Sequence, residues 1–177
     1  MKGIAIVVLA LLVIAGGLLL FAATKPDTFQ VQRTVTIKAP PEKIFALIGD
    51  VHRWGIWSPY EKLDPAMRRT LSGAAEGKGS IYEWDSDSRA GRGRMEITDA
   101  SPPSQVTIKL DFVKPIEGHN TAEFTLEPKG DSTNVTWLMY GPSAYIAKVI
   151  GIFVSMDKMI GDDFEAGLAN LKSVAEK

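Results

Sequence analysis

Residues 4–23 form one uninterrupted apolar run, IAIVVLALLVIAGGLLLFAA, which contains no charged or strongly polar side chain. A helix of about 20 residues is roughly 30 Å long, which matches the hydrocarbon core of a bilayer. Such a helix satisfies its own backbone polar groups, as lipid requires. Lys25 and Pro26 then end the run with a charge and a helix-breaking residue. We therefore predict one N-terminal transmembrane helix within residues 1–24.

A cleaved signal peptide is the alternative interpretation of this run. The apolar region of a signal peptide is about 7–15 residues long and ends at small residues. This run is longer, and Phe21 fits poorly close to a cut after Ala23, so the anchor is favoured. Positive-inside counting slightly favours a cytoplasmic amino terminus, because Lys2 lies beside it and Asp27 offsets Lys25. We expect a single-pass membrane protein whose soluble domain lies on the extracytoplasmic side.

The composition after the run narrows the possible functions. Of the 20 basic and 21 acidic residues, only Lys2 precedes Lys25, so the remainder has a net charge of −2. A surface of mixed sign does not attract nucleic acid, and we expect no nucleic-acid partner. The chain has no cysteine and only two histidines, His52 and His119. We therefore predict no catalytic set, no metal site and no cofactor, and the sequence identifies no protein partner.

Residues 25–28 are predicted to be a linker, and residues 29–177 are predicted to form one domain. The domain begins with alternating apolar and polar positions. This alternation predicts strands at residues 30–38, 67–72, 80–84, 92–98, 106–112, 121–127 and 134–139. Glycine and proline turns separate the strands, which indicates an antiparallel meander. Arg33 interrupts the apolar face of the first strand.

Helical segments frame these strands. Pro40 and Pro41 open a short helix with an apolar face, and an aromatic-rich turn or short helix follows at residues 52–60. From residue 153 to residue 171 apolar residues recur every three or four positions, which predicts a long C-terminal helix. Gly151 is the position at which this helix is expected to break, if it breaks. The order of elements predicts an α+β domain in which the sheet packs on the C-terminal helix.

Several short motifs together carry a family resemblance. In chain order they are Pro40-x-Glu42-x-Ile44-Phe45, Asp50 with Trp54, Trp57-Ser58-Pro59-Tyr60, Gly73, Gly77-x-Gly79-Ser80, Tyr82-x-Trp84, Val135-Thr136-Trp137 and Asp163-Phe164-Glu165-x-Gly167-Leu168-x-x-Leu171-Lys172. The chain from about Phe29 to Lys177 therefore resembles the START-like superfamily, also called SRPBCC, of polyketide cyclase/dehydrase and lipid-transport-like proteins. The resemblance implies a helix-grip fold, in which an antiparallel sheet wraps around the long C-terminal helix and an apolar cavity. It implies no particular reaction.

Because the resemblance implies an apolar cavity, the apolar residues predicted to face inward are candidates for its lining. The alternative for any one of them is ordinary core packing. The candidates are Leu110, Phe112, Phe124, Leu126, Trp137, Met139, Met156, Ile160 and Phe164. Trp54, Trp57 and Tyr60 are candidates for the cavity rim, and the alternative is a plug that packs on the sheet edge. Residues 144–154 are unusually apolar and too short to span a bilayer. They form either the start of the buried helix or a lip that touches the membrane at the cavity mouth.

These observations favour one function over two alternatives. The leading hypothesis is membrane-tethered binding or transfer of an apolar small molecule or lipid, with the membrane contact made by residues 4–23. The first alternative is an enzyme of the polyketide-cyclase type. The second is a structural or regulatory module whose cavity is filled by its own side chains.

The anchor makes the first testable prediction. Because the apolar run is long enough to span a bilayer, the full-length protein should remain in the membrane pellet after washing with alkaline carbonate. Sequencing of the mature amino terminus provides the control. A mature protein that begins near Thr24 or Lys25 would contradict the anchor and indicate a secreted domain.

Overall fold

The computed structural model describes residues 2–88 and 90–177. The helices are α1 (Lys2–Ala23), α2 (Pro41–Ile48), α3 (Tyr145–Ile150) and α4 (Met156–Ala175), with the short 3-10 helices η1 (Val51–Ile56) and η2 (Pro59–Lys62). The strands are β1 (Thr28–Ile37), β2 (Arg68–Gly73), β3 (Ser80–Asp85), β4 (Arg92–Ser101), β5 (Gln105–Lys114), β6 (Gly118–Lys129) and β7 (Ser132–Pro142).

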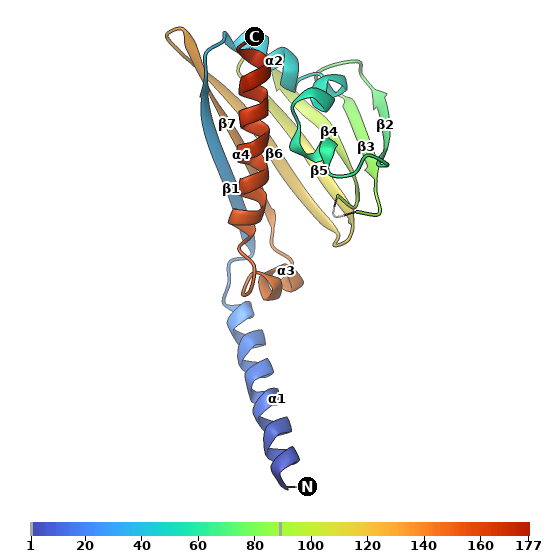
Figure 1. The fold of residues 1–177 in the computed structure, drawn as a ribbon, viewed down its shortest axis with the longest axis vertical. Helices are drawn as coiled ribbons and strands as arrows, with labels where there is room; N and C mark the ends of the chain where they lie inside the picture. Colours follow the sequence, from blue (N-terminus) through green and yellow to red (C-terminus); the bar gives the residue numbers. More distant parts are fainter. Residues whose placement is uncertain (1, 89) are drawn as a thin grey trace.

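The strands form one antiparallel sheet in the order β1-β7-β6-β5-β4-β3-β2. Its curved inner face wraps around α4, and α2, η1 and η2 cover the remaining part of that face (Figure 1). The first strand pairs with the last, with Val31 opposite Met139. The same arrangement sets Phe124 opposite Trp137 on the inner face. The α+β helix-grip architecture expected from the sequence is therefore confirmed.

The sequence located the elements well but not their ends. The weakest strand candidate forms β2, whose six residues are all exposed at the sheet edge. The expected C-terminal helix is divided into α3 and α4, and Gly151 caps α3. Ser155 then begins α4, because its side chain accepts a hydrogen bond from the Lys158 backbone N–H. The break therefore lies in residues 151–155.

Arg33, which interrupts the apolar pattern of β1, connects that strand to α4. Its Nε donates to Glu165 Oε1 at 2.6 Å, and its Nη1 donates to Asp157 Oδ1 at 3.1 Å. Hydrogen bonds to Asp157 and to Glu165 raise the pKa of the guanidinium above its ordinary value. Gly161 provides the room, because a side chain there would collide with the guanidinium. The charged residue that interrupts the apolar pattern of β1 therefore connects the sheet to α4.

Helix α1 extends away from the domain and makes its main contact with α3 (Figure 1). Residues 3–23 are long and apolar enough to cross a membrane, although a signal sequence near an amino terminus would pass the same test. Within residues 3–23, only Ala22 belongs to the buried residues. The folded domain therefore presents α1 as a separate apolar rod rather than as part of its core.

Gly167 on α4 makes a prediction about how closely the helix meets the sheet. A Cβ at this position would lie 2.8 Å from Trp137 Cζ3 and 2.8 Å from Pro59 Cδ. Gly167→Ala should therefore lower the free energy of unfolding by about 1–3 kcal/mol through overpacking, despite the better helix propensity of alanine. Urea denaturation of the full-length protein in detergent measures the change.

The control for this prediction is Ala166→Ser on the exposed neighbouring position. It should change the free energy of unfolding by less than about 0.5 kcal/mol. A Gly167→Ala variant as stable as the wild type would show that the contact between α4 and Trp137 is looser than described.

Candidate ligand-binding cavity

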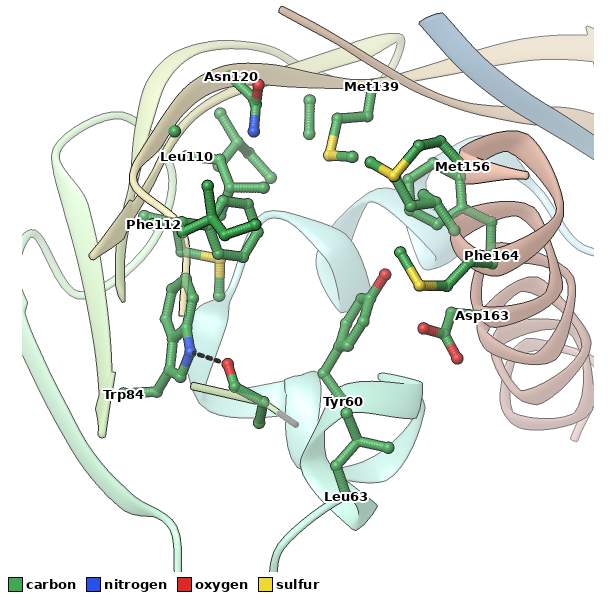
Figure 2. Close-up of a pocket in the computed structure, with 18 of the residues that line it drawn as sticks. Tyr60, Leu63, Trp84, Leu110, Phe112, Asn120, Met139, Met156, Asp163 and Phe164 are labelled. Carbon is green, nitrogen blue, oxygen red and sulfur yellow. Dashed lines mark hydrogen bonds between the residues drawn. The ribbon is translucent and has the colours of Figure 1, made fainter. Parts of the chain in front are cut away.

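A cavity of about 450 Å³ lies between the inner face of the sheet, the first half of α4 and the η1–η2 segment. The sheet provides one wall with Leu110, Phe112, Phe124, Trp137 and Met139. Helix α4 provides a second wall with Met156, Ile160 and Phe164. Trp54 and Tyr60 contribute from η1 and η2, and Figure 2 shows Tyr60 between Trp84 and Phe164. Because most of the surface that lines it is apolar, the space suits an apolar occupant.

Eight of the nine residues that the sequence suggested as cavity candidates line this space. Leu126 does not line it. This side chain is 2% exposed and lies two residues beyond Phe124 on β6, a strand that α2 contacts, and it belongs to the packed core. The alternation along β6 places both residues on the same face of the sheet but does not show what covers each of them.

Two of the three rim candidates, Trp54 and Tyr60, line the cavity, and Trp57 does not. Trp57 is fully buried and donates its indole N–H to the Leu47 carbonyl at 3.0 Å. Trp54 likewise donates to the Ile48 carbonyl at 2.9 Å. These bonds occupy carbonyl groups at the end of α2, which explains why the tryptophans pack inward rather than at an outer rim.

Stacked and edge-on aromatic rings form the floor of the cavity. Trp137 stacks on Phe164 with ring centroids 4.0 Å apart, and Phe124 lies 4.7 Å from the same indole. Trp57 meets Trp137 edge-on, with ring centroids 5.8 Å apart. The Trp137 indole N–H is buried without a hydrogen-bond partner in the described part of the chain. The floor is therefore rigid and offers no accessible polar group of its own.

The cavity wall contains a polar cluster that the sequence did not reveal. The Tyr82 hydroxyl donates to Glu61 Oε1, and Arg69 Nε donates to Glu61 Oε2 at 2.6 Å. Burial, together with the neighbouring Glu61 carboxylate, raises the pKa of the Tyr82 hydroxyl, so this group stays neutral. The alternation of β3 shows that Tyr82 faces inward, but no local pattern pairs it with a carboxylate 21 positions away.

Methionine is concentrated at the cavity to a degree that the sequence did not suggest. Five of the six methionines in the chain line it, and they are Met67, Met95, Met139, Met156 and Met159. Only Met139 and Met156 were expected. Methionine side chains are unbranched and polarizable, so a wall built from them can adapt to ligands of different shape.

The exposed residues of the cavity lining gather at the end of the domain at which α1 is attached, so we place the mouth of the cavity there. Ile116 and Glu117 of the β5–β6 turn line one side of the mouth, and Ala147 and Ile150 of α3 line another. The β5–β6 turn lies at this end because β1 begins and β7 ends there, as the pairing of Thr28 with Pro142 shows. Figure 1 shows α3 between the domain and α1.

Neither histidine lies in the cavity lining. His52 hydrogen-bonds Asp50 at 2.9 Å, and His119 hydrogen-bonds Asp111 at 2.7 Å, both at the exposed surface. Within residues 2–88 and 90–177 no cluster of three or more His, Cys, Asp or Glu side chains could hold a metal ion. The described lining therefore offers burial of apolar surface beside a few polar groups, which include the Glu61–Tyr82 pair, Asn120 and Asp163 (Figure 2).

Comparison with known proteins gives a family and a fold. The family model for polyketide cyclase / dehydrase and lipid transport matches residues 28–176. Major latex-like protein 151 from Panax ginseng superposes with a TM-score of 0.61 at 15% identity, covering 86% of this chain and 100% of its own. Protein CV1439 from Chromobacterium violaceum superposes with a TM-score of 0.59 at 14% identity, covering 86% and 99%.

A third solved structure is the di-domain ARO/CYC BexL from the BE-7585A biosynthetic pathway. It superposes with a TM-score of 0.61 at 18% identity and covers 89% of this chain and 53% of its own. No curated protein matches the sequence. At these identities the structural matches establish a shared fold and no shared ligand.

Because the floor of the cavity is more deeply buried than its wall, we predict that substitutions in the floor lower stability more. Trp137 is 3% exposed within the aromatic floor, so Trp137→Ala should lower the free energy of unfolding by about 3–5 kcal/mol. Phe112 is only half-buried because one side of its ring faces the cavity. Phe112→Ala should therefore have a smaller effect, below about 2 kcal/mol. Urea denaturation compares the two variants directly, and equal losses would show that Phe112 is packed rather than facing a void.

Proposed function

The chain belongs to the polyketide cyclase / dehydrase and lipid transport family, and from this premise we propose that it binds an apolar small molecule or lipid at a membrane. The observation that carries the proposal is that large apolar side chains, such as Phe112 and Met156, face an open cavity instead of one another. The cavity volume of about 450 Å³ lies in the range of small-molecule sites.

The physical basis of binding would be burial of the ligand's apolar surface. Each methylene group removed from water contributes about 0.8 kcal/mol, so a chain of about ten gains roughly 8 kcal/mol before its ordering is subtracted. The methionine-rich wall would let the cavity adjust to the shape of the chain. Shape and burial, rather than a set of hydrogen bonds, would therefore select the ligand.

The proposed tether is α1, which the sequence favours as an anchor over a signal sequence. A domain held at the membrane surface stays close to a reservoir of apolar molecules that are scarce in water. Exchange of such a ligand then requires no long diffusion of the protein. This role suits a binding or transfer protein whose soluble domain remains attached to one membrane.

A cyclase-type reaction is the second candidate, and the cluster of Glu61, Tyr82 and Arg69 favours it because it brings acid–base groups to the cavity wall. However, the hydrogen bonds of the cluster are made within the protein. Arg69 also donates to the Met67 carbonyl at 2.8 Å and to the Glu61 carbonyl at 3.0 Å. These contacts serve to position η2 against β2, and we therefore place binding first.

Intrinsic fluorescence tests the proposal, because Trp54, Trp84 and Trp137 line the cavity. The full-length protein is reconstituted in nanodiscs and titrated with ω-bromododecanol, whose bromine atom quenches nearby tryptophans. We expect saturable quenching that removes at least half of the emission. In Ala122→Phe, which places a ring inside the cavity, the apparent affinity should fall at least ~10-fold, since a tenfold change corresponds to only about 1.4 kcal/mol.

The matched control is Ala166→Phe, the same substitution on the exposed side of α4. It should leave the titration unchanged, and circular dichroism should show that both variants are folded. Quenching that rises linearly in the wild type, or that Ala122→Phe leaves unaltered, would indicate a packed module without a binding site.

A further inference from the structure

A cluster of six large apolar or aromatic side chains is exposed between residues 145 and 159. These residues belong to α3, the loop that follows it and the start of α4. We call them the apolar lip, and they are Tyr145, Ile146, Ile150, Phe153, Val154 and Met159. Phe153 is 73% exposed and Ile146 is 52% exposed. A cluster of this kind on a water-soluble surface ordinarily marks a contact with another molecule or with a membrane.

Two contacts hold the lip against the end of α1. The Tyr145 hydroxyl donates to the Leu19 carbonyl at 2.7 Å. Leu19 lies four residues before Ala23, which is about 6 Å inside the end of the helix at ~1.5 Å per residue. Lys148 is the only charged side chain in residues 144–156, and it is buried and paired with Asp27 of the linker. The lip therefore lies level with the last turn of the apolar helix and turns no charge toward it.

The lip is also part of the cavity mouth. Ile150 and Met159 are partly exposed at the surface and also line the cavity. Ile116, on the opposite side of the mouth, is exposed as well. An apolar surface therefore leads along α3 and the start of α4 from the lip to the interior, and Glu117 on the opposite side of the mouth is the charged side chain nearest to Ile116 in the chain.

We propose that the apolar lip lies in the interfacial layer of the same bilayer that α1 spans, so that the cavity mouth opens onto the membrane. The occupant of this surface is the lipid bilayer, because the lip continues the apolar surface of α1 through the contact of Tyr145 with Leu19. Tyrosine favours this layer, where its ring is buried and its hydroxyl meets polar groups. The inference rests on the proposed membrane tether and adds that the ligand passes between bilayer and cavity without entering water.

The absence of cysteine in the chain allows a direct measurement of depth. Phe153→Cys and Ile146→Cys each introduce one thiol for an NBD fluorophore. Ile56→Cys is the matched control, because Ile56 is 55% exposed, as Ile146 is at 52%, but lies on η1 away from α1. The labelled full-length proteins are placed singly in phosphatidylcholine nanodiscs, with and without doxyl-labelled lipid.

We expect NBD emission at positions 146 and 153 to shift to shorter wavelength and to lose at least half of its intensity to the doxyl lipid. The label at position 56 should show neither change. Equal behaviour at all three positions would overturn the inference. A shift that appears only when two proteins share a nanodisc would also overturn it, since a second copy of the chain would then cover the lip.

Titration of the same samples with ω-bromododecanol separates this inference from the proposed function. Saturable tryptophan quenching with a water-exposed lip would leave ligand binding in place and refute the membrane contact. Phe153→Glu adds a test of the path, because a charge in the lip should draw it out of the interface without altering the cavity. We expect it to slow quenching by alcohol delivered from the bilayer at least fivefold, with unchanged quenching at saturation, and an unchanged rate would overturn the proposed path.

Discussion

The stack of Trp137 on Phe164, with centroids 4.0 Å apart, holds α4 against the inner face of the sheet, and the cavity depends on where this contact lies. Toward the C-terminus of α4, Leu168 and Leu171 are buried and complete the core. Toward its N-terminus, Met156 and Ile160 face the cavity instead. The same helix is therefore a core element in one half and a cavity wall in the other.

An apolar cavity next to a helix would be expected to shrink unless something holds the helix in place. Arg33 makes such a contact from β1 to the first half of α4, where it binds Asp157 and Glu165. On the opposite side Glu61, Arg69 and Tyr82 fix η2 to β2 and β3. Partly exposed ion pairs contribute little to overall stability, but they restrict the direction in which each wall can move. They are therefore restraints on the cavity more than sources of stability.

The shared fold is compatible with several functions, and the position of the cavity mouth reduces the number of functions to consider. The solved structures with this architecture are only 14–18% identical to this chain, so the shared fold assigns it no ligand. In this chain the mouth, the break between α3 and α4, and the end of α1 lie at the same end of the domain. That arrangement is the basis on which we propose that the cavity faces a membrane, a relation that the fold alone does not suggest.

The sequence by itself determined the apolar run, the strands and the helical stripe, because periods of two and of 3.6 residues are properties of the local chain. It also indicated the inward face of β5, β6 and β7, where apolar and polar residues alternate. Only the tertiary structure decided which of these face a void. Phe124 and Leu126 are equivalent in the pattern of β6, yet Phe124 lines the cavity whereas Leu126 is packed away from it in the core. The pairing of Glu61 with Tyr82 likewise required two distant segments to meet, and a local pattern holds no information about such a meeting.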